Sequence, residues 1–393
     1  MKLLHTSDWH LGRSFHEEDM LPAQRGFVDQ LVDLVRAEGI DVVLVAGDVY
    51  DQAMPRVDVI RVFDDALVRL RRAGAEIVVT SGNHDSAVRL GVGSSFMAFG
   101  GLHVRTEVTR AWEPVVFPAD GHQVAVYPVP YLEPRLVRDG LGVSDPGHTP
   151  VAAEVLDRIW ADLDERRTTT ADPVVGIVMA HVFASGGAGS ESERPLSVGG
   201  LDVVPTSLFE RFDYAALGHL HGRQVLAPGV RYSGSPLHYS FSEAGHTKGA
   251  WLLRTGADRS AGSTAPVEVE GVDWRAHRPL RRLSGPIDEL LGASEYAEAE
   301  GAYCQITLTD AERPARALSR LKERFPHVLQ LIFAPADGAA RQSTYAQRVG
   351  QGRPPLEVSA DFLAHVRQRS ANGAERGELE RLVEAALTEA ATA

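Results

Sequence analysis

The stretch that decides the fold is Ile40-Asp41-Val42-Val43-Leu44-Val45-Ala46-Gly47-Asp48. Its apolar run, residues 40–46, has the length of a strand and suits a sheet that is covered on both faces. A helical pattern over residues 27–35 precedes it and ends at Gly39, since glycine commonly follows the last turn of a helix. The stretch therefore predicts a buried strand of an α/β protein, with Asp48 directly after the strand.

The same alternation continues on both sides of this stretch. Lys2–Thr6 is expected to be a strand, Val57–Arg72 an amphipathic helix closed by Gly74, and Ala75–Thr80 another strand. This β-α-β-α-β order predicts a parallel sheet with right-handed crossovers. We expect the later strands, which follow one another at shorter spacing, to form a second, more antiparallel sheet packed on the first. These strands are Gln123–Val129, Val174–Ala180, Tyr214–Leu217, Val230–Ser233 and Gly249–Arg254.

The pattern changes toward the C-terminus. A small β-α-β-α-β unit is expected within residues 276–335. Its elements are Arg278–Leu283, Ile287–Leu291, Tyr303–Leu308, Ala315–Phe325 and Val328–Phe333. Residues 336–355 are rich in Gly, Ala, Gln and Pro and are predicted to be a linker. Two apolar stripes within residues 356–393, separated by Asn372-Gly373, predict a helical hairpin.

Composition narrows the class of protein without defining its chemistry. With 393 residues, the chain is long enough for two or more domains. The net charge of −13 argues against a protein that coats nucleic acid non-specifically, although local fields can still bind DNA. No apolar run is long enough to cross a membrane and no signal peptide is expected. Cys304 is the only cysteine, so a reducing cytoplasm is the expected location.

Side chains that commonly bind metal ions directly follow several of the predicted strands. The motifs are Asp8-Trp9-His10, Gly47-Asp48, Gly82-Asn83-His84-Asp85, His181 and Gly218-His219-Leu220-His221. Residues i and i+2 of an extended segment point the same way, so both members of such a pair can face one ion. A lone histidine at a strand end is more often structural. The joint occurrence of these motifs at the carboxyl ends of strands, where ligands collect in α/β sheets, predicts a metal centre.

The motifs match the signature of calcineurin-like metallophosphoesterases, and longer segments resemble the SbcD branch of DNA repair nucleases. Those segments are Ser7–Arg13, Gly47–Asp51, Ser192–Gly200, Ala216–His221 and Tyr232–Leu237. The resemblance is dense over residues 1–275. It implies an α/β fold in which two sheets form a sandwich flanked by helices, as the nuclease domain. It further implies a DNA-binding capping domain of α+β type over residues 276–335 and a helical hairpin over residues 356–393.

By this resemblance, two divalent metal ions are the expected cofactors. One ion would be held by Asp8, His10, Asp48 and His221. The other would be held by Asp48, Asn83, His181 and His219, with Asp48 bridging. Two ions about 3.5–4 Å apart can clamp a phosphodiester between them. Mixed imidazole, carboxylate and amide ligands favour Mn²⁺, Fe²⁺ or Zn²⁺ over Mg²⁺, and family precedent implies Mn²⁺.

Two residues beside the expected ligands have separate roles. His84 is expected to be the catalytic residue, facing the scissile phosphate and donating a proton to the leaving oxygen or stabilising charge there. Asp85 is expected to orient its neighbours rather than bind an ion. Some relatives have a further histidine where this chain has Gln52, so Gln52 receives no catalytic role.

Several arginines are candidates for DNA contact, since the guanidinium group suits phosphate geometry. They are Arg13, Arg194, Arg275, Arg278, Arg281 and Arg282. For each of them, an ordinary ion pair or a solvated surface position is the alternative.

The resemblance implies a hydrolase of DNA phosphodiester bonds in repair, recombination and replication. It would act as a 3′-to-5′ exonuclease on duplex ends and as an endonuclease on single strands and hairpins. ATP dependence would come from an SbcC-type ABC ATPase, whose coiled coil the helical hairpin would contact. The expected assembly is a nuclease dimer in a two-plus-two heterotetramer. The alternatives are a stand-alone metallophosphatase or cyclic-nucleotide phosphodiesterase, and a non-catalytic DNA-binding subunit.

Overall fold

The computed structural model describes most of the chain. The described ranges are 1–193, 203–256, 267–335, 356–357, 359–360, 362–363 and 371–392. They group into a compact unit of residues 1–308 with 315–332 and a second unit of residues 309–314 with 333–393. Among the described helices, none is long and apolar enough to cross a membrane.

The first sheet has the strand order β14-β13-β1-β4-β5-β6. Its bounds are β1 (Lys2–Thr6), β4 (Val42–Ala46), β5 (Glu76–Thr80), β6 (Leu102–Arg105), β13 (Gly249–Thr255) and β14 (Val267–Asp273). Strands β1, β4, β5 and β6 are parallel, which confirms the predicted crossover unit. Every residue of β4 is buried, as expected of a strand covered on both faces.

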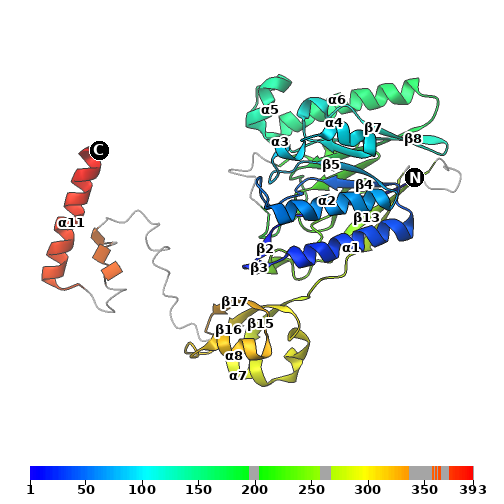
Figure 1. Cartoon of the computed structure of the whole chain (residues 1–393). Coiled ribbons are helices and arrows are strands. Elements are labelled where there is room, and N and C mark those ends of the chain that lie inside the picture. The colour runs from blue at the N-terminus through cyan, green and yellow to red at the C-terminus, as the bar shows by residue number, and fades with distance from the viewer. Residues whose placement is uncertain are drawn as a thin grey trace. The chain divides into compact units, whose positions relative to one another are not determined.

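Helices α1 (Leu21–Glu38) and α2 (Val57–Arg72) cover one face of this sheet (Figure 1). Helix α1 ends where Gly39 adopts the left-handed conformation, with φ 62°, and its N–H binds the carbonyl of Val35. Phe27, Leu31 and Val35 of α1 are buried against the sheet.

The second sheet has the strand order β11-β12-β10-β9-β8-β7. Its bounds are β7 (Val115–Ala119), β8 (His122–Pro128), β9 (Val174–His181), β10 (Tyr214–Gly218), β11 (Gln224–Ala227) and β12 (Val230–Tyr232). The prediction of a more antiparallel sheet is wrong, because β8, β9, β10 and β12 pair in parallel. The prediction also misplaced Gly249–Arg254, which is the core of β13 and pairs with β1 in the first sheet.

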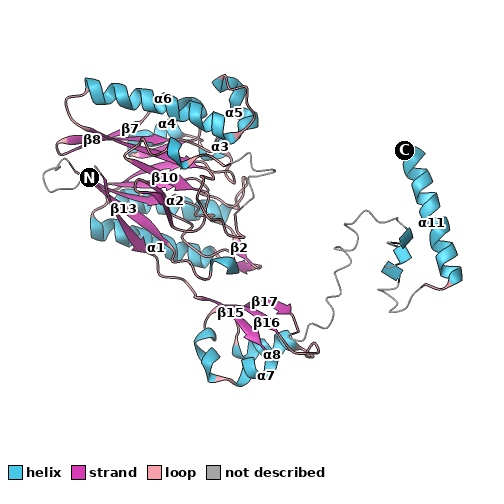
Figure 2. Cartoon of the chain, turned by 180° about the vertical axis from the view of Figure 1, so that it is seen from behind, coloured by secondary structure: helices cyan, strands magenta, loops and turns pink. Residues whose placement is uncertain are grey.

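The two sheets pack face to face around a shared core. Leu3, Leu44 and Val78 of the first sheet join Val126 and Ile177 of the second in one buried cluster. The outer face of the second sheet is covered by α6 (His148–Thr169), so the layers run helix, sheet, sheet, helix (Figure 2). This confirms the predicted two-sheet sandwich flanked by helices.

Shorter elements complete the first unit. They are β2 (Ser14–Phe15), β3 (Glu18–Asp19), α3 (Ala87–Leu90), α4 (Ser94–Met97) and α5 (Pro134–Leu141). Residues 280–333 add a sheet with the order β15-β16-β17 and two helices. Their bounds are β15 (Leu280–Gly285), α7 (Ile287–Gly292), β16 (Tyr303–Leu308), α8 (Ala317–Arg324) and β17 (Val328–Phe333). This is the β-α-β-α-β order predicted for the small unit.

The C-terminal predictions are only partly covered by the described residues. The linker of residues 336–355 lies outside them, as does most of the first helix of the predicted hairpin. The second helix, α11 (Gly373–Thr392), starts where the sequence predicted. Asn372 and Glu375 cap it reciprocally, each side chain accepting a hydrogen bond from the other's N–H at 3.0 and 2.9 Å. The hairpin itself stays a prediction.

Candidate metal centre

The predicted ligands follow the carboxyl ends of strands in both sheets. Asp8 and His10 follow β1, Asp48 follows β4 and Asn83 follows β5. His181 is the last residue of β9, while His219 and His221 follow β10. Because β1, β4 and β5 are parallel neighbours and β9 pairs with β10, these ends meet at one edge of the sandwich.

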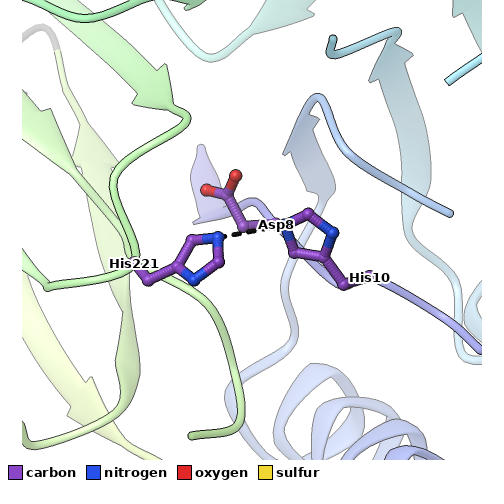
Figure 3. Close-up of side chains that lie close together, drawn as sticks. All are labelled: Asp8, His10 and His221. Carbon is purple, nitrogen blue, oxygen red and sulfur yellow. Dashed lines mark hydrogen bonds between the residues drawn. The ribbon is translucent and has the colours of Figure 1, made fainter. Parts of the chain in front are cut away.

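The first predicted ion site is formed by side chains that lie close together. Asp8, His10 and His221 offer ligand atoms that all lie within 4.8 Å of one another (Figure 3). Nε2 of His10 lies 3.0 Å from Nε2 of His221. Nε2 of His10 also lies 3.5 Å from a carboxylate oxygen of Asp48.

The second predicted ion site lies on the other side of Asp48. The same Asp48 oxygen is 3.4 Å from Nε2 of His181. The amide oxygen of Asn83 is 3.0 Å from Nε2 of His181 and 3.3 Å from Nδ1 of His219. The structure therefore brings all seven predicted ligands together. Asp48 lies close to members of both predicted sites, and Asp8 also forms a close group with Asp48 and His181.

The backbone at these ligands is strained. Asp8, His10, Asp48 and His219 have φ values of 53°, 42°, 49° and 107°, in a region that residues other than glycine rarely adopt. Such conformations cost about 1–3 kcal/mol each and persist where the surrounding structure enforces them. Their concentration at this edge indicates a functional centre.

Two glycines allow the ligand loops to approach closely. A Cβ atom on Gly82 would lie 2.1 Å from a carboxylate oxygen of Asp48, and one on Gly47 would lie 2.3 Å from Nδ1 of His181. Gly47 also has a positive φ of 83°. Any larger residue at either position would displace a predicted ligand.

Burial and neighbouring charges shift the pKa values of the ligands in opposite directions. Burial lowers the pKa of His10, His219 and His221, which favours the neutral imidazole that binds metals. Burial alone would raise the pKa of Asp48, but His181 and His10 outweigh it and hold this pKa well below its usual range. Burial alone would lower the pKa of His181, but the nearby carboxylate of Asp48 raises the pKa of His181 to about 9.

His84 lies at the edge of this group. Its backbone N–H donates to a carboxylate oxygen of Asp48 at 2.9 Å, and its Nδ1 lies 2.8 Å from the carbonyl of Asp51. A carbonyl only accepts, so Nδ1 carries a proton. His84 also forms a close group with His10 and Asp48, as ligands to one ion would.

Asp85 ties two of the ligand loops together. Its carboxylate accepts hydrogen bonds from the N–H groups of Val49, Tyr50 and Gly82 at 3.1, 2.9 and 2.9 Å. Burial and the nearby Asp48 raise the pKa of Asp85 to about 7. These contacts position the loop of Asp48 against the loop of Asn83, as expected of an orienting residue.

Comparison with known proteins shows the family to which the chain belongs. The model of the calcineurin-like phosphoesterase family matches residues 1–223, more than half of the chain. The chain belongs to the calcineurin-like phosphoesterase family. Residues 276–367 of this phosphoesterase match a second model, the SbcD-type domain described as the type 5 capsule protein repressor C-terminal domain.

Solved structures resemble the phosphoesterase only distantly. A dimetal phosphatase of Danio rerio is 13% identical, covers 70% of this chain and 96% of its own, and has a TM-score of 0.41. A protein of Thermus thermophilus is 12% identical, with coverages of 69% and 98% and a TM-score of 0.35. GAP50 of Plasmodium is 10% identical, with coverages of 86% and 99% and a TM-score of 0.36. The family assignment rests on the domain match.

The residues present fit the two divalent ions that this family uses. Buried imidazoles, two carboxylates and an amide oxygen converge, which is the mixture that suits first-row divalent metals. Nδ1 of His181 lies 3.0 Å from the carbonyl of Ala46, which leaves Nε2 as the ligand atom. The chain is a metal-dependent phosphoesterase.

The predicted DNA-binding arginines differ in their surroundings. Arg13 is half-buried, donates to the carbonyl of Ser192 at 2.6 Å and lies over the ring of Tyr239. Arg194 lies outside the described residues. Arg275, Arg281 and Arg282 are exposed, and Arg278 donates to the carbonyl of Gly301 while lying over the ring of Tyr303.

Sequence reasoning gave no role to several residues that contact the predicted ligands. Asp51 lies 3.4 Å from Nδ1 of His10 through its carboxylate. Ser192 contacts His221, and Glu243 and Lys248 form a buried ion pair behind it. Glu243 and Lys248 lie outside any ligand-like spacing in the sequence, so no local signal marked them.

Proposed function

We propose that this phosphoesterase is the nuclease subunit of a complex of the SbcC–SbcD type and hydrolyses DNA phosphodiester bonds. The supporting observation is the combination of two domain matches in one chain, the phosphoesterase at residues 1–223 and the SbcD-related C-terminal domain at residues 276–367. A phosphatase or cyclic-nucleotide phosphodiesterase for small substrates would not need the second domain.

The proposed reactions are 3′-to-5′ exonuclease cleavage of duplex ends and endonuclease cleavage of single strands and hairpins. Mn²⁺ is the proposed metal, and DNA repair, recombination and replication are the proposed processes. The exposed Arg275, Arg281 and Arg282 would contact the phosphate backbone, because DNA binding depends on neutralising phosphate charge. A cytoplasmic location is proposed as well, supported by the single cysteine, Cys304, which suits a reducing compartment.

The chain's own residues would prepare the phosphodiester for in-line attack. Bound divalent ions would supply Lewis acidity and an activated water. Asp8, His10 and His221 would hold one ion and Asn83, His181 and His219 the other, with Asp48 shared between them. The carboxylate of Asp85 would keep the Asp48 and Asn83 loops in register through its three backbone hydrogen bonds.

His84 would act on the leaving group. Its Nδ1 proton is directed to the carbonyl of Asp51, which fixes the ring and leaves Nε2 to face the centre. In its protonated form the ring can deliver the Nε2 proton to the departing sugar oxygen, a role that contributes about 10²–10⁴-fold to a hydrolysis rate.

The proposed partners are an SbcC-type ABC ATPase, single- and double-stranded DNA, and a second copy of the chain. The ATPase would be bound through the predicted hairpin of residues 356–393, whose apolar stripes suit a coiled-coil surface. Support for a homodimer comes from large apolar side chains that are exposed on the segment after His84. Val88, Phe96 and Phe99 are 83%, 84% and 91% exposed. Their chain neighbours Arg89 and Met97 line a groove of about 240 Å³.

The test is Mn²⁺-dependent cleavage of end-labelled linear duplex DNA by the purified full chain, with and without the ATPase and ATP. Wild type and a control variant, His103→Ala, should cleave, since His103 lies on β6 and pairs with Glu76 away from the centre. His84→Ala should lose about 10²–10⁴-fold of the rate while its metal content stays unchanged. Absence of DNA cleavage under every condition, with fast hydrolysis of a small phosphodiester, would contradict the nuclease and favour a small-substrate hydrolase.

A further inference from the structure

A buried ion pair lies behind one of the predicted metal ligands. Glu243 is 0% and Lys248 is 4% exposed, and their side chains are in direct contact. Removing two charges from water costs several kcal/mol per ion, so a buried pair is weak evidence of stabilisation. A role in positioning gives a better account of it, because both members of the pair make contacts that reach His221.

The first contact runs through Ser192. The Ser192 hydroxyl lies 2.5 Å from Oε1 of Glu243 and 2.5 Å from Nδ1 of His221. Glu243, paired with Lys248, is a carboxylate and can only accept, so the single hydroxyl proton of Ser192 is donated to it. Ser192 must then accept a proton from Nδ1 of His221. His221 is therefore held in the tautomer that carries its proton on Nδ1.

This tautomer leaves the lone pair on Nε2, the atom that faces the metal centre. Nε2 of His221 lies 3.0 Å from Nε2 of His10. A ring nitrogen must be free of its proton to bind a metal ion, and the opposite nitrogen usually donates to a fixed acceptor. For His221 this acceptor is the hydroxyl oxygen of Ser192, whose own proton is donated to Glu243.

The backbone of His221 is fixed by the same group of residues. Lys248 donates to the carbonyl of His221 at 2.8 Å and to the hydroxyl of Ser235 at 2.9 Å. Glu193 accepts from the N–H of His221 at 2.7 Å. Nδ1, N–H and carbonyl of His221 are thus all held by protein groups, and Nε2 remains for the ion.

The histidine His181 of the second ion site is held in a different way from His221. Its Nδ1 contacts the carbonyl of Ala46, a backbone group that no substitution removes. His221 instead depends on side chains, so its positioning can be altered without changing a ligand.

We propose that Ser192, oriented by Glu243 and Lys248, is a positioning residue that sets the tautomer of His221 and thereby the affinity for the ion on the Asp8–His10 side. This inference rests on the proposed two-metal centre. It predicts that the two ions of one chain respond differently to loss of the Ser192 hydroxyl.

The test is Mn²⁺ binding to the metal-free full chain. Calorimetry measures the affinities, and electron paramagnetic resonance shows whether the bound ions are coupled. Wild type should bind two ions per chain and give the spectrum of a coupled pair. Ser192→Ala should bind one ion as wild type does and the other about 10–100-fold more weakly, the usual effect of losing a residue that orients a ligand. At limiting Mn²⁺ its spectrum should be that of an isolated ion.

Two further variants separate positioning from packing. Thr255→Ala removes another buried hydroxyl, on β13, that contacts His122 and none of the residues around His221, so it should bind both ions as wild type does. Ser192→Thr keeps the hydroxyl and should restore the affinity for the ion that Ser192→Ala binds more weakly. Equal loss in Ser192→Ala and Ser192→Thr would assign the effect to packing and overturn the inference.

The outcomes also separate this inference from the proposed function. Wild-type protein that binds fewer than two ions would remove the two-metal centre and the inference with it. Wild type that binds two ions, alongside a Ser192→Ala variant with unchanged affinities, would overturn the inference alone and leave the proposed nuclease intact.

Discussion

A carboxylate oxygen of Asp48 lies 3.4 Å from Nε2 of His181, although Asp48 follows β4 of the first sheet and His181 ends β9 of the second. The same oxygen lies 3.5 Å from Nε2 of His10, next to the first sheet's other ligands. The carboxylate of Asp48 is thus close to predicted ligands from both sheets. Asp48 is also buried and has a positive φ of 49°.

Removal of this carboxylate should reduce the metal content of the chain. We expect Asp48→Asn to lose affinity for both ions by more than the roughly 10–100-fold that is typical of residues behind the ligands. Phosphodiester hydrolysis should fall with it, because both ions depend on the shared charge. Metal analysis after dialysis measures the loss. Asp33→Asn, an exposed change on α1, is the control, and full retention of two ions in Asp48→Asn would refute the bridging role.

Gly82 should be intolerant of even a methyl group. In Gly82→Ala the new Cβ would lie 2.1 Å from a carboxylate oxygen and 2.4 Å from the backbone nitrogen of Asp48, so the loop must shift. Overpacking of this kind costs about 1–3 kcal/mol, which urea unfolding of the metal-free chain would detect. Gly100→Ala is a matched control, since no atom lies within 4 Å of its Cβ position. Equal stability of the two variants would show that the loop adapts without cost.

The metal ligands that lie near strand ends could be predicted from the sequence. The ligands lie at strand ends or within a few residues after them, as Asp48 follows residues 42–46, so periodicity and strand-end position were sufficient to find them. The helix α6 was missed although Val151, Val155 and Ile159 recur at helical spacing and are fully buried. That signal was present in the sequence.

Long-range pairing was not predictable in the same way. Spacing alone suggested an antiparallel second sheet, but β9 pairs in parallel with both β8 and β10 through connections whose direction short motifs do not encode. The ion pair of Glu243 and Lys248 illustrates the same limit. It becomes meaningful only when folding brings Ser192 and His221 beside it, which no local pattern records.

His5 should make the stability of the fold depend on pH. Its ring is fully buried, with Nδ1 2.9 Å from the hydroxyl of Tyr214 and Nε2 3.2 Å from the carbonyl of Leu217. Burial lowers the pKa of His5 from 6.5 to about 3. Between these values the unfolded chain binds the proton more readily than the folded chain, so stability falls as pH drops from about 6.5 toward 3. The loss from this residue approaches about 1.4 kcal/mol per pH unit.

The double variant His5→Phe/Tyr214→Phe should remove this contribution. Both polar partners are replaced together, which avoids leaving a buried hydroxyl without its hydrogen bond. Urea unfolding at several pH values should give a shallower acid dependence than in wild type. Tyr214→Phe alone keeps the imidazole and should keep the wild-type slope. Parallel curves for wild type and the double variant would rule out titration of His5 as a cause.

The exposed apolar segment after His84 should determine the oligomeric state. A single copy of the chain leaves Val88, Phe96 and Phe99 largely in water, and patches of this kind on soluble proteins commonly mark interfaces. A second copy would cover them with the same surface, as in an isologous dimer. Charge introduced at the centre of such a contact would be desolvated on association. We therefore expect Phe96→Asp/Phe99→Asp to shift sedimentation from dimer to monomer while the chain stays folded, because neither side chain is in the core. Leu136→Asp, an equally exposed apolar position on α5 at 82%, should leave the dimer unchanged. A dimer that persists in the double variant, or a wild type that is monomeric throughout, would assign this surface to another occupant.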